Sequence, residues 1–164
     1  MEYNNDQVRR RDRLLSPERA AQLLRESEWG VLSMIDAQGA PYGIPVNYVW
    51  DGQSSAYVHC APVGHKLDAI AAHPEVTLTL VGRVGLKPAL FTTEYESVVL
   101  RGTAHVGLSD DEKRHGLRLL VDKLSPEHKE LGLKYIEKSF YRVEVIRLDF
   151  TTWSGKCKRI GHQS

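Results

Sequence analysis

Several features that would reveal a function directly are scarce in this sequence. Its 164 residues include only two cysteines, Cys60 and Cys157, which cannot build a disulfide framework and favour a reducing compartment. No run approaches the ~20 consecutive apolar residues that span a bilayer, and the N-terminus is charged where a signal peptide is apolar. The formal net charge of +1, from 22 basic and 21 acidic residues, argues against a nucleic-acid partner. We therefore expect a cytoplasmic protein with no nucleic-acid and no membrane partner.

The motifs of several common site classes are also missing. There is no Walker A loop, no G-x-G-x-x-G fingerprint and no paired-carboxylate hydrolase signature. His59, Cys60 and His65 lack the paired spacing of a structural zinc site, which needs four ligands. The sequence therefore predicts no metal site, while ligation of haem by His59 or His65 stays open. The basic cluster Arg9–Arg13 has acidic neighbours and is interpreted as part of a solvated arm.

The residues that are present predict one domain with a hydrophobic core. The chain is 41% hydrophobic and of ordinary domain length, so we assign residues 1–164 to one domain, with 1–13 as a loosely held polar arm and 154–164 as a basic tail. Apolar alternation predicts strands, and helical spacing after capping residues predicts helices. The expected strands span 29–36, 42–50, 55–60, 75–82, 95–107 and 140–153. The expected helices follow Ser16, Gly64, Ser109 and Leu124, with Ser16 and Ser109 as N-caps. Residues 83–94 are expected to form an irregular connection.

Two residues inside the expected strands predict departures from a regular sheet. Pro45 cannot donate to a ladder, so its strand lies at an edge or is bulged. Gly102 interrupts the longest strand signal, which indicates a bulge or a close approach by another backbone or a ligand. Strands joined mostly by tight turns, with helices inserted singly, favour an antiparallel barrel or a strongly curved sheet over a doubly wound parallel sheet.

The stretch Gly64-His65-Lys66 is the strongest local indication of a ligand. It begins a short helix, and a helix N-terminus carries free N–H groups and a partial positive charge that favour an anion. Lys66 adds a point charge suited to a phosphate, and His65 adds a second donor. A pair of ordinary solvated surface residues is the alternative interpretation.

Other polar residues have two interpretations each. His59 either faces a ligand held by the loop that follows it or is a rim histidine satisfied by the backbone, and Cys60 is expected to be an inert thiol. Trp153, with Lys156 beside it, either stacks on a flat ligand or plugs the end of a barrel. Ser97 either donates to an anion or faces water.

Taken in order, these segments resemble the pyridoxamine 5′-phosphate oxidase-like superfamily, and within it the nitroimidazole-resistance (Nim) branch of flavoproteins. The resemblance extends over nearly the whole chain. Its most specific part is the run from Tyr57 to Ala69, with an aromatic residue, His59, an alanine and then Gly64, Lys66 and Asp68-Ala69. The resemblance implies a mainly β fold, an antiparallel split β-barrel of the FMN-binding type, and a homodimer with FMN between the subunits.

The resemblance also implies roles for residues of this chain. Lys66 and His65 would hold the FMN phosphate, with Ser97 on the same side. His59 would be the catalytic residue that contacts the substrate or supplies a proton. The wall of the ring pocket would come from residues of two strands and from the partner subunit, namely Val46, Asn47, Tyr48, Tyr57, His59, Cys60, Trp153 and Lys156.

The function implied by the resemblance is electron transfer through FMN. The expected reaction takes electrons from a reduced donor such as a nicotinamide cofactor to a small nitroaromatic or quinone-like acceptor. The alternative is a split-barrel protein that binds flavin or haem without turnover. Two departures from the family matter here, since His65 stands where relatives have lysine or arginine, and the tail lacks the terminal arginine pattern of true pyridoxamine phosphate oxidases.

Overall fold

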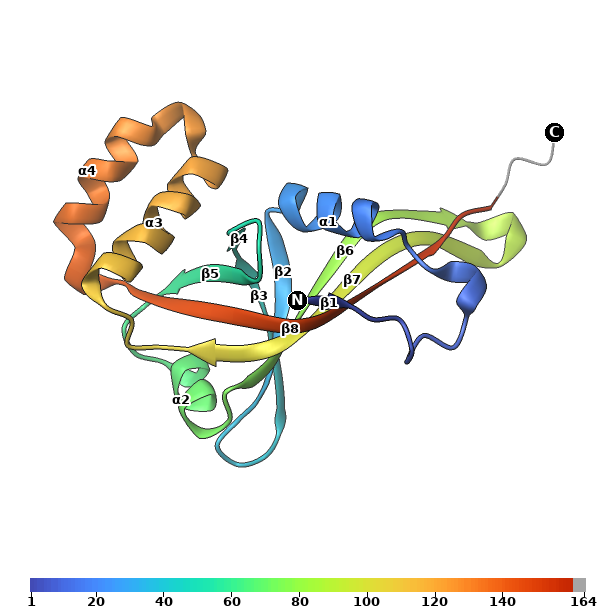
Figure 1. The fold of residues 1–164 in the computed structure, drawn as a ribbon, viewed down its shortest axis with the longest axis horizontal. Helices are drawn as coiled ribbons and strands as arrows, with labels where there is room; N and C mark the ends of the chain where they lie inside the picture. The colour runs from blue at the N-terminus through green and yellow to red at the C-terminus, as the bar shows by residue number, and fades with distance from the viewer. Residues whose placement is uncertain (161–164) are drawn as a thin grey trace.

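The computed structural model describes residues 1–160 and shows one strongly curved, mainly antiparallel sheet with helices at its margins (Figure 1). The strands are β1 (Glu2–Tyr3), β2 (Trp29–Ile35), β3 (Pro41–Asn47), β4 (Val49–Trp50), β5 (Ser55–Cys60), β6 (Glu75–Lys87), β7 (Thr92–His105) and β8 (Glu144–Lys158). The α-helices are α1 (Pro17–Glu26), α2 (His65–Ala72), α3 (Asp110–Leu124) and α4 (Lys129–Ser139). Short 3-10 helices are η1 (Arg11–Arg13), η2 (Pro88–Leu90), η3 (Pro126–His128) and η4 (Phe140–Arg142).

The helix starts follow the capping signals in the sequence. The Ser16 hydroxyl accepts the Arg19 N–H, and Pro17 occupies the first position of α1. At α3 the Ser109 hydroxyl accepts the Glu112 N–H. Both predicted caps are confirmed.

The order of the strands explains how the sheet closes. The order is β3-β2-β6-β7-β8-β5-β4, and β1 pairs with β8. β3 and β4 therefore lie at opposite ends of the sheet, although only Tyr48 separates them in the chain. The sheet must curl until its two ends meet, and β3 approaches β5 without a ladder between them. This is the expected split β-barrel, and Pro45 lies on its edge strand as predicted.

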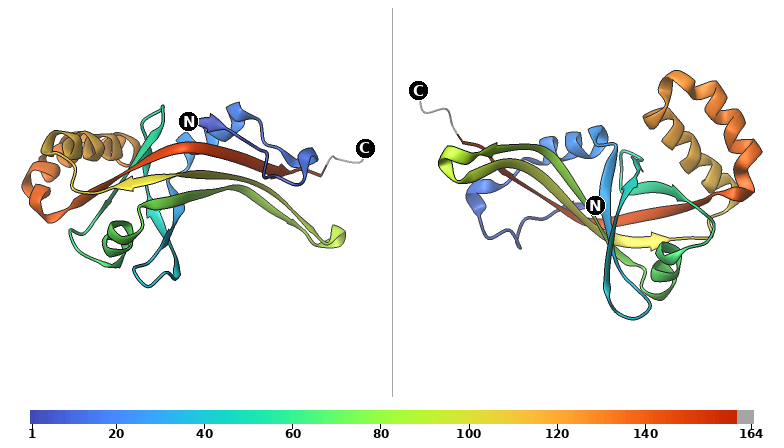
Figure 2. Two further views of the ribbon diagram at one scale, coloured as in Figure 1. Left: turned by 60° about the horizontal axis from the view of Figure 1, so that its bottom comes forward. Right: turned by 180° about the vertical axis from the view of Figure 1, so that it is seen from behind.

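Two hydrophobic clusters lie on opposite sides of this sheet. The larger one fills the barrel and extends under α1, with Leu32, Leu78 and Leu100 fully buried. The smaller one packs α3 and α4 against the outer side of β5 and β8, around Tyr57 and Val145. Figure 2 shows α3 and α4 side by side at one end of the molecule and the β6–β7 hairpin at the other end.

Gly102 marks the predicted bulge. The register between β7 and β8 shifts between Arg101 and Gly102. A Cβ atom at Gly102 would lie 1.9 Å from the Asp149 carbonyl oxygen, so only glycine permits this backbone approach.

Two sequence expectations about the far end of the sheet were wrong. Residues 83–94 are not irregular, because β6 continues to Lys87 after a register shift between Val81 and Val84, and β7 already begins at Thr92. The last strand runs to Lys158, so residues 154–158 of the expected tail pair with β7 instead. This strand begins at Glu144 and not at residue 140 as expected, because Phe140–Arg142 forms η4. Residues 161–164 of that tail lie outside the described residues.

The N-terminal arm is docked on the sheet in this structure. β1 pairs in parallel with β8, the Asn4 N–H donates to the Trp153 carbonyl at 2.8 Å, and the Tyr3 ring packs edge-on against Trp153 at 4.9 Å between centroids. The Tyr3 hydroxyl donates to the Leu15 carbonyl. The arm therefore covers one end of the barrel core.

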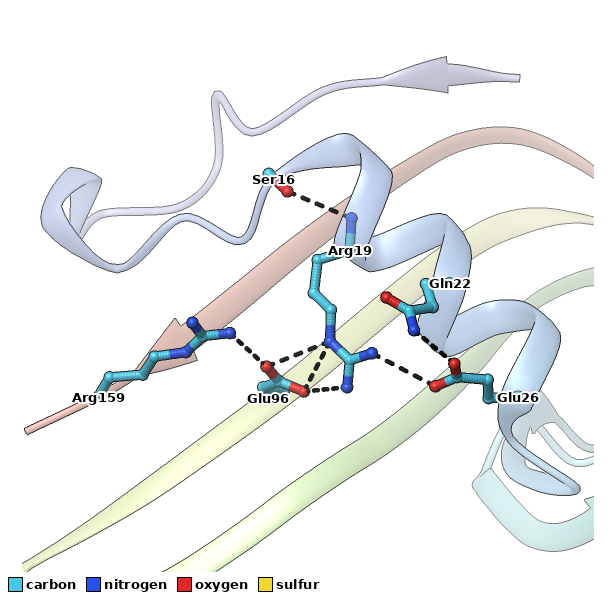
Figure 3. Close-up of polar contacts among 6 residues, drawn as sticks. All are labelled: Ser16, Arg19, Gln22, Glu26, Glu96 and Arg159. Atoms are coloured by element: carbon cyan, nitrogen blue, oxygen red, sulfur yellow. Dashed lines mark hydrogen bonds and ion pairs between the residues drawn. The ribbon is translucent and has the colours of Figure 1, made fainter.

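Glu96 is a buried acid that ties three segments together (Figure 3). Its carboxylate accepts from the Arg19 guanidinium of α1 at 2.7 Å and from the Arg159 guanidinium at the end of β8 at 2.8 Å. These two cations lower the pKa of Glu96, Arg19 with the larger effect, so the carboxylate is charged at neutral pH. The network fixes α1 and the C-terminal end of β8 to β7.

Candidate functional site

The split between β3 and β5 leads to the N-terminus of α2, and several predicted site residues lie along it. β3 pairs only with β2 among the described strands, so its other edge offers unladdered main-chain groups from Val46 to Tyr48. The Asn47 side chain is exposed and donates to the Glu28 carbonyl at 3.0 Å. His59 and Cys60 end the facing strand β5.

The N-terminus of α2 has the features of an anion site. Gly64 has φ +144°, a backbone conformation that favours glycine, and no side chain caps the helix. A Cβ at Gly64 would meet nothing within 4 Å, so the approach to the helix end is open. Lys66 has no carboxylate within 4.0 Å in residues 1–160. The start of α2 thus combines helix N–H groups that have no side-chain cap with a lysine that has no carboxylate partner in the described residues.

His65 is oriented differently from Lys66. Its Nε2 lies 3.8 Å from the Asp36 carboxylate, and its ring packs edge-on against Tyr42 with centroids 4.5 Å apart. Both partners belong to the β2–β3 hairpin, so His65 holds α2 against that hairpin. The carboxylate of Asp36 would also compete with an anion for this imidazole. Sequence reasoning missed Asp36, which carried no motif.

The charge of Lys66 acts on both predicted residues of β5. Desolvation lowers the pKa of His59 and Lys66 lowers it further, so the imidazole is neutral at pH 7. Burial raises the pKa of Cys60, with Lys66 opposing this and Glu144 reinforcing it, so Cys60 is a thiol and not a thiolate. His59 can therefore donate one N–H, and Cys60 is not an activated nucleophile.

The two predicted tyrosines serve the packing of the protein. Tyr48 is fully buried; its hydroxyl donates to the Leu24 carbonyl at 2.7 Å, and Lys123 lies 4.1 Å from its ring centroid. Tyr57 is buried under α3 with its ring 5.7 Å from that of His115. Only the main chain of Tyr48 can therefore face the split.

The remaining predicted residues are not brought to α2 within one chain. Ser97 and Lys156 are cross-strand partners on the sheet face opposite Glu96, and the Lys156 ammonium lies 5.9 Å from the Tyr95 ring. Trp153 lies on the other face, is 8% exposed, and contacts the Tyr3 ring edge-on. Within one chain Trp153 therefore packs under the N-terminal arm at the end of the barrel core.

A groove beside His59 was not anticipated from the sequence. It has a volume of about 840 Å³ and lies between α3, α4 and the end of β5. Leu117, Leu120 and Ile136 form its buried floor, and His128 and Arg142 stand on its margin with His59. No local pattern in the sequence indicates that α3 and α4 leave part of their apolar faces uncovered.

The described residues contain neither a candidate metal cluster nor a candidate membrane-spanning helix. Residues 1–160 contain no group of three or more His, Cys, Asp or Glu side chains placed to hold a metal ion. Within the same range, no helix combines the length and apolarity needed to cross a membrane.

Comparison with known structures supports the fold. A candidate 5-nitroimidazole antibiotic resistance protein from Bacteroides thetaiotaomicron aligns with TM-score 0.71 and 19% identity over 88% of this chain and 86% of that one. An FAD- and haem-binding protein from Mycobacterium smegmatis aligns with TM-score 0.74 and 21% identity, over 90% of this chain and 74% of that one. The flavocytochrome Anf3 from Azotobacter vinelandii aligns with TM-score 0.77 and 23% identity, over 98% of this chain and 77% of that one.

Sequence comparison identifies the family. No curated protein sequence matches the chain significantly. The family model described as pyridoxamine 5′-phosphate oxidase matches residues 16–157, from the cap of α1 to the penultimate residue of β8. The chain therefore belongs to the pyridoxamine 5′-phosphate oxidase family.

Proposed function

We propose that this protein binds FMN at the split of the barrel and passes electrons from a reduced donor to a small nitroaromatic or quinone-like acceptor. The observation that carries the proposal is the open N-terminus of α2 with the unpaired Lys66 ammonium beside it. Family membership and the flavin named for two of the similar structures support the same cofactor class. A bound flavin would supply the redox chemistry, and the chain would supply binding and orientation.

The residues around the split fit a phosphorylated, planar cofactor. Lys66 and the first N–H groups of α2 would hold the phosphate, as helix N-termini do. The free edge of β3 from Val46 to Asn47 offers main-chain donors and acceptors to a ring edge. His59, neutral at pH 7, would donate an N–H to the acceptor and so orient it.

The proposal includes a homodimer. Trp29 and Val81 are 50% and 47% exposed, and β-sheet register places them on the same open sheet face as Ser97 and Lys156. Exposed large apolar side chains on a sheet face that no helix covers are suited to a partner surface. A second copy packed there would bring its Ser97 and Lys156 toward the cofactor.

The phosphate assignment is tested by comparing FMN with riboflavin, which lacks the phosphate. We expect Lys66→Ala to weaken FMN binding about 10- to 100-fold, the effect of losing hydrogen bonds to a charged group, and to leave riboflavin binding unchanged. Quenching of flavin fluorescence measures both affinities. Lys134→Ala, an exposed lysine on α4, is the matched control. Equal FMN affinity in Lys66→Ala and in the parent would contradict the assignment.

The role of His59 and the alternative functions have separate readouts. His59→Ala should keep FMN but slow the oxidation of reduced protein by a quinone. A Soret band in freshly purified protein would instead favour a haem binder. Bound FMN that neither NADH nor NADPH reduces would favour binding without turnover.

A further inference from the structure

The groove beside β5 is apolar at its floor and has a cationic side chain, Arg142, at its margin. The floor consists of Leu117, Leu120 and Ile136, which are 5% to 7% exposed. Among the described residues no aspartate or glutamate lines the groove, whereas His59, His128 and Arg142 do. Arg142 has no carboxylate within 4.0 Å in residues 1–160. An apolar body with an anionic group matches both properties.

The size of the groove selects among such molecules. Its volume of about 840 Å³ lies in the upper part of the roughly 300–1,000 Å³ range of small-molecule sites. A single-ring nitroaromatic would leave most of it unfilled, and the leucine walls would lose their dispersion contacts. Leu131 and Tyr135, one turn apart on α4, extend the apolar surface along the helix and are 68% and 67% exposed. The groove is therefore suited to a long apolar body.

We propose that the groove between α3, α4 and the end of β5 binds a long-chain carboxylate, with its chain along the two helices and its carboxylate at Arg142. Arg142, the one arginine of the described lining, supplies the single positive charge that a monocarboxylate needs. The site is distinct from the proposed phosphate site at Lys66 and does not require a bound flavin.

The test uses the full chain and the fluorescent fatty acid cis-parinaric acid, with its methyl ester as the uncharged comparison. We expect saturable binding of the acid and about tenfold weaker binding of the ester, because the ester lacks the charge that pairs with Arg142. Arg142→Gln should weaken binding of the acid about tenfold and remove its preference over the ester. Arg9→Gln, an exposed arginine of the N-terminal arm, should change nothing.

A second variant tests the apolar wall without a folding risk. Leu131→Glu introduces a carboxylate at an exposed position of the groove margin and should weaken binding of the acid and of the ester at least tenfold. Leu86→Glu makes the same change at a 75% exposed leucine of the distant β6–β7 hairpin and should have no effect. Four results would each overturn the proposal. The first two are no saturable binding and equal binding of the acid and the ester. The others are equal effects of the two leucine variants and displacement of the probe by haem with a Soret band.

Discussion

Replacing Glu96 by glutamine should destabilise the fold more than replacing Arg159, the more exposed of the two arginines that bind it. Breaking a buried ion pair by removing one partner costs about 3–5 kcal/mol when the remaining charge stays buried. Here Arg19 is 29% and Arg159 69% exposed, so both regain much of their hydration. We therefore expect about 2 kcal/mol for Glu96→Gln, in the range of hydrogen bonds to charged groups. Arg159→Gln should cost about 0.5 kcal/mol, as exposed pairs do.

The pH dependence of the Glu96→Gln effect has a defined sign. The folded-state pKa of Glu96 lies below its ordinary value of 4.5, because Arg19 and Arg159 favour the carboxylate. The stabilisation is therefore fully present above about pH 4.5 and is lost as the pH falls through the folded-state pKa. Urea unfolding of the parent and of the Glu96→Gln and Arg159→Gln variants at about pH 7 and about pH 4 measures this.

The reasoning would be refuted by either of two results. One is that Glu96→Gln is as stable as the parent at pH 7, which would mean that the two cations contribute nothing net. The other is that the difference between parent and variant grows as the pH falls below 4.5. Arg159→Gln as costly as Glu96→Gln would also contradict the assigned effect of solvent exposure.

Three further results are expected. Gly102→Ala should lower the free energy of unfolding in urea by about 3 kcal/mol, because its Cβ would lie 1.9 Å from a carbonyl oxygen. Gly85→Ala, whose Cβ would have its nearest neighbour at 3.7 Å, should lower it by under about 1 kcal/mol. Ser109→Ala should cost about 1 kcal/mol through the lost helix cap, and a null effect on thermal unfolding would contradict that. Burial lowers the pKa of Lys123 to about 8 from 10.5, so stability should rise with pH between these values, and Lys123→Met should flatten that rise in urea titrations.

The features that the sequence predicted correctly depend on residues close together in the chain. Ser16 and Ser109 cap helices through N–H groups three residues away, and Gly64 with Lys66 forms the start of α2 within one turn. Gly102 carried its own indication of a bulge. Local chemistry of this kind is independent of how distant segments pack.

The features that the sequence did not predict depend on pairing between distant segments. Residues 83–87 contain glycine and basic residues, yet they form a strand because 92–95 offer a partner edge, with Lys87 and Glu94 paired at 3.1 Å. Residues 154–158 extend β8 for the same reason, opposite Tyr95 to Val99. The orientation of His65 toward Asp36 arises from contacts between α2 and a hairpin nearly thirty residues earlier, and no local pattern encodes it.

The single residue between β3 and β4 makes the entrance of the barrel a fixed aperture. Any movement of β3 relative to β4 would have to be absorbed by the two backbone torsions of Tyr48, whose ring is held between Leu24 and Lys123. The width of the split is therefore set when the protein folds, and a ligand has to fit that width because it cannot push the strands apart.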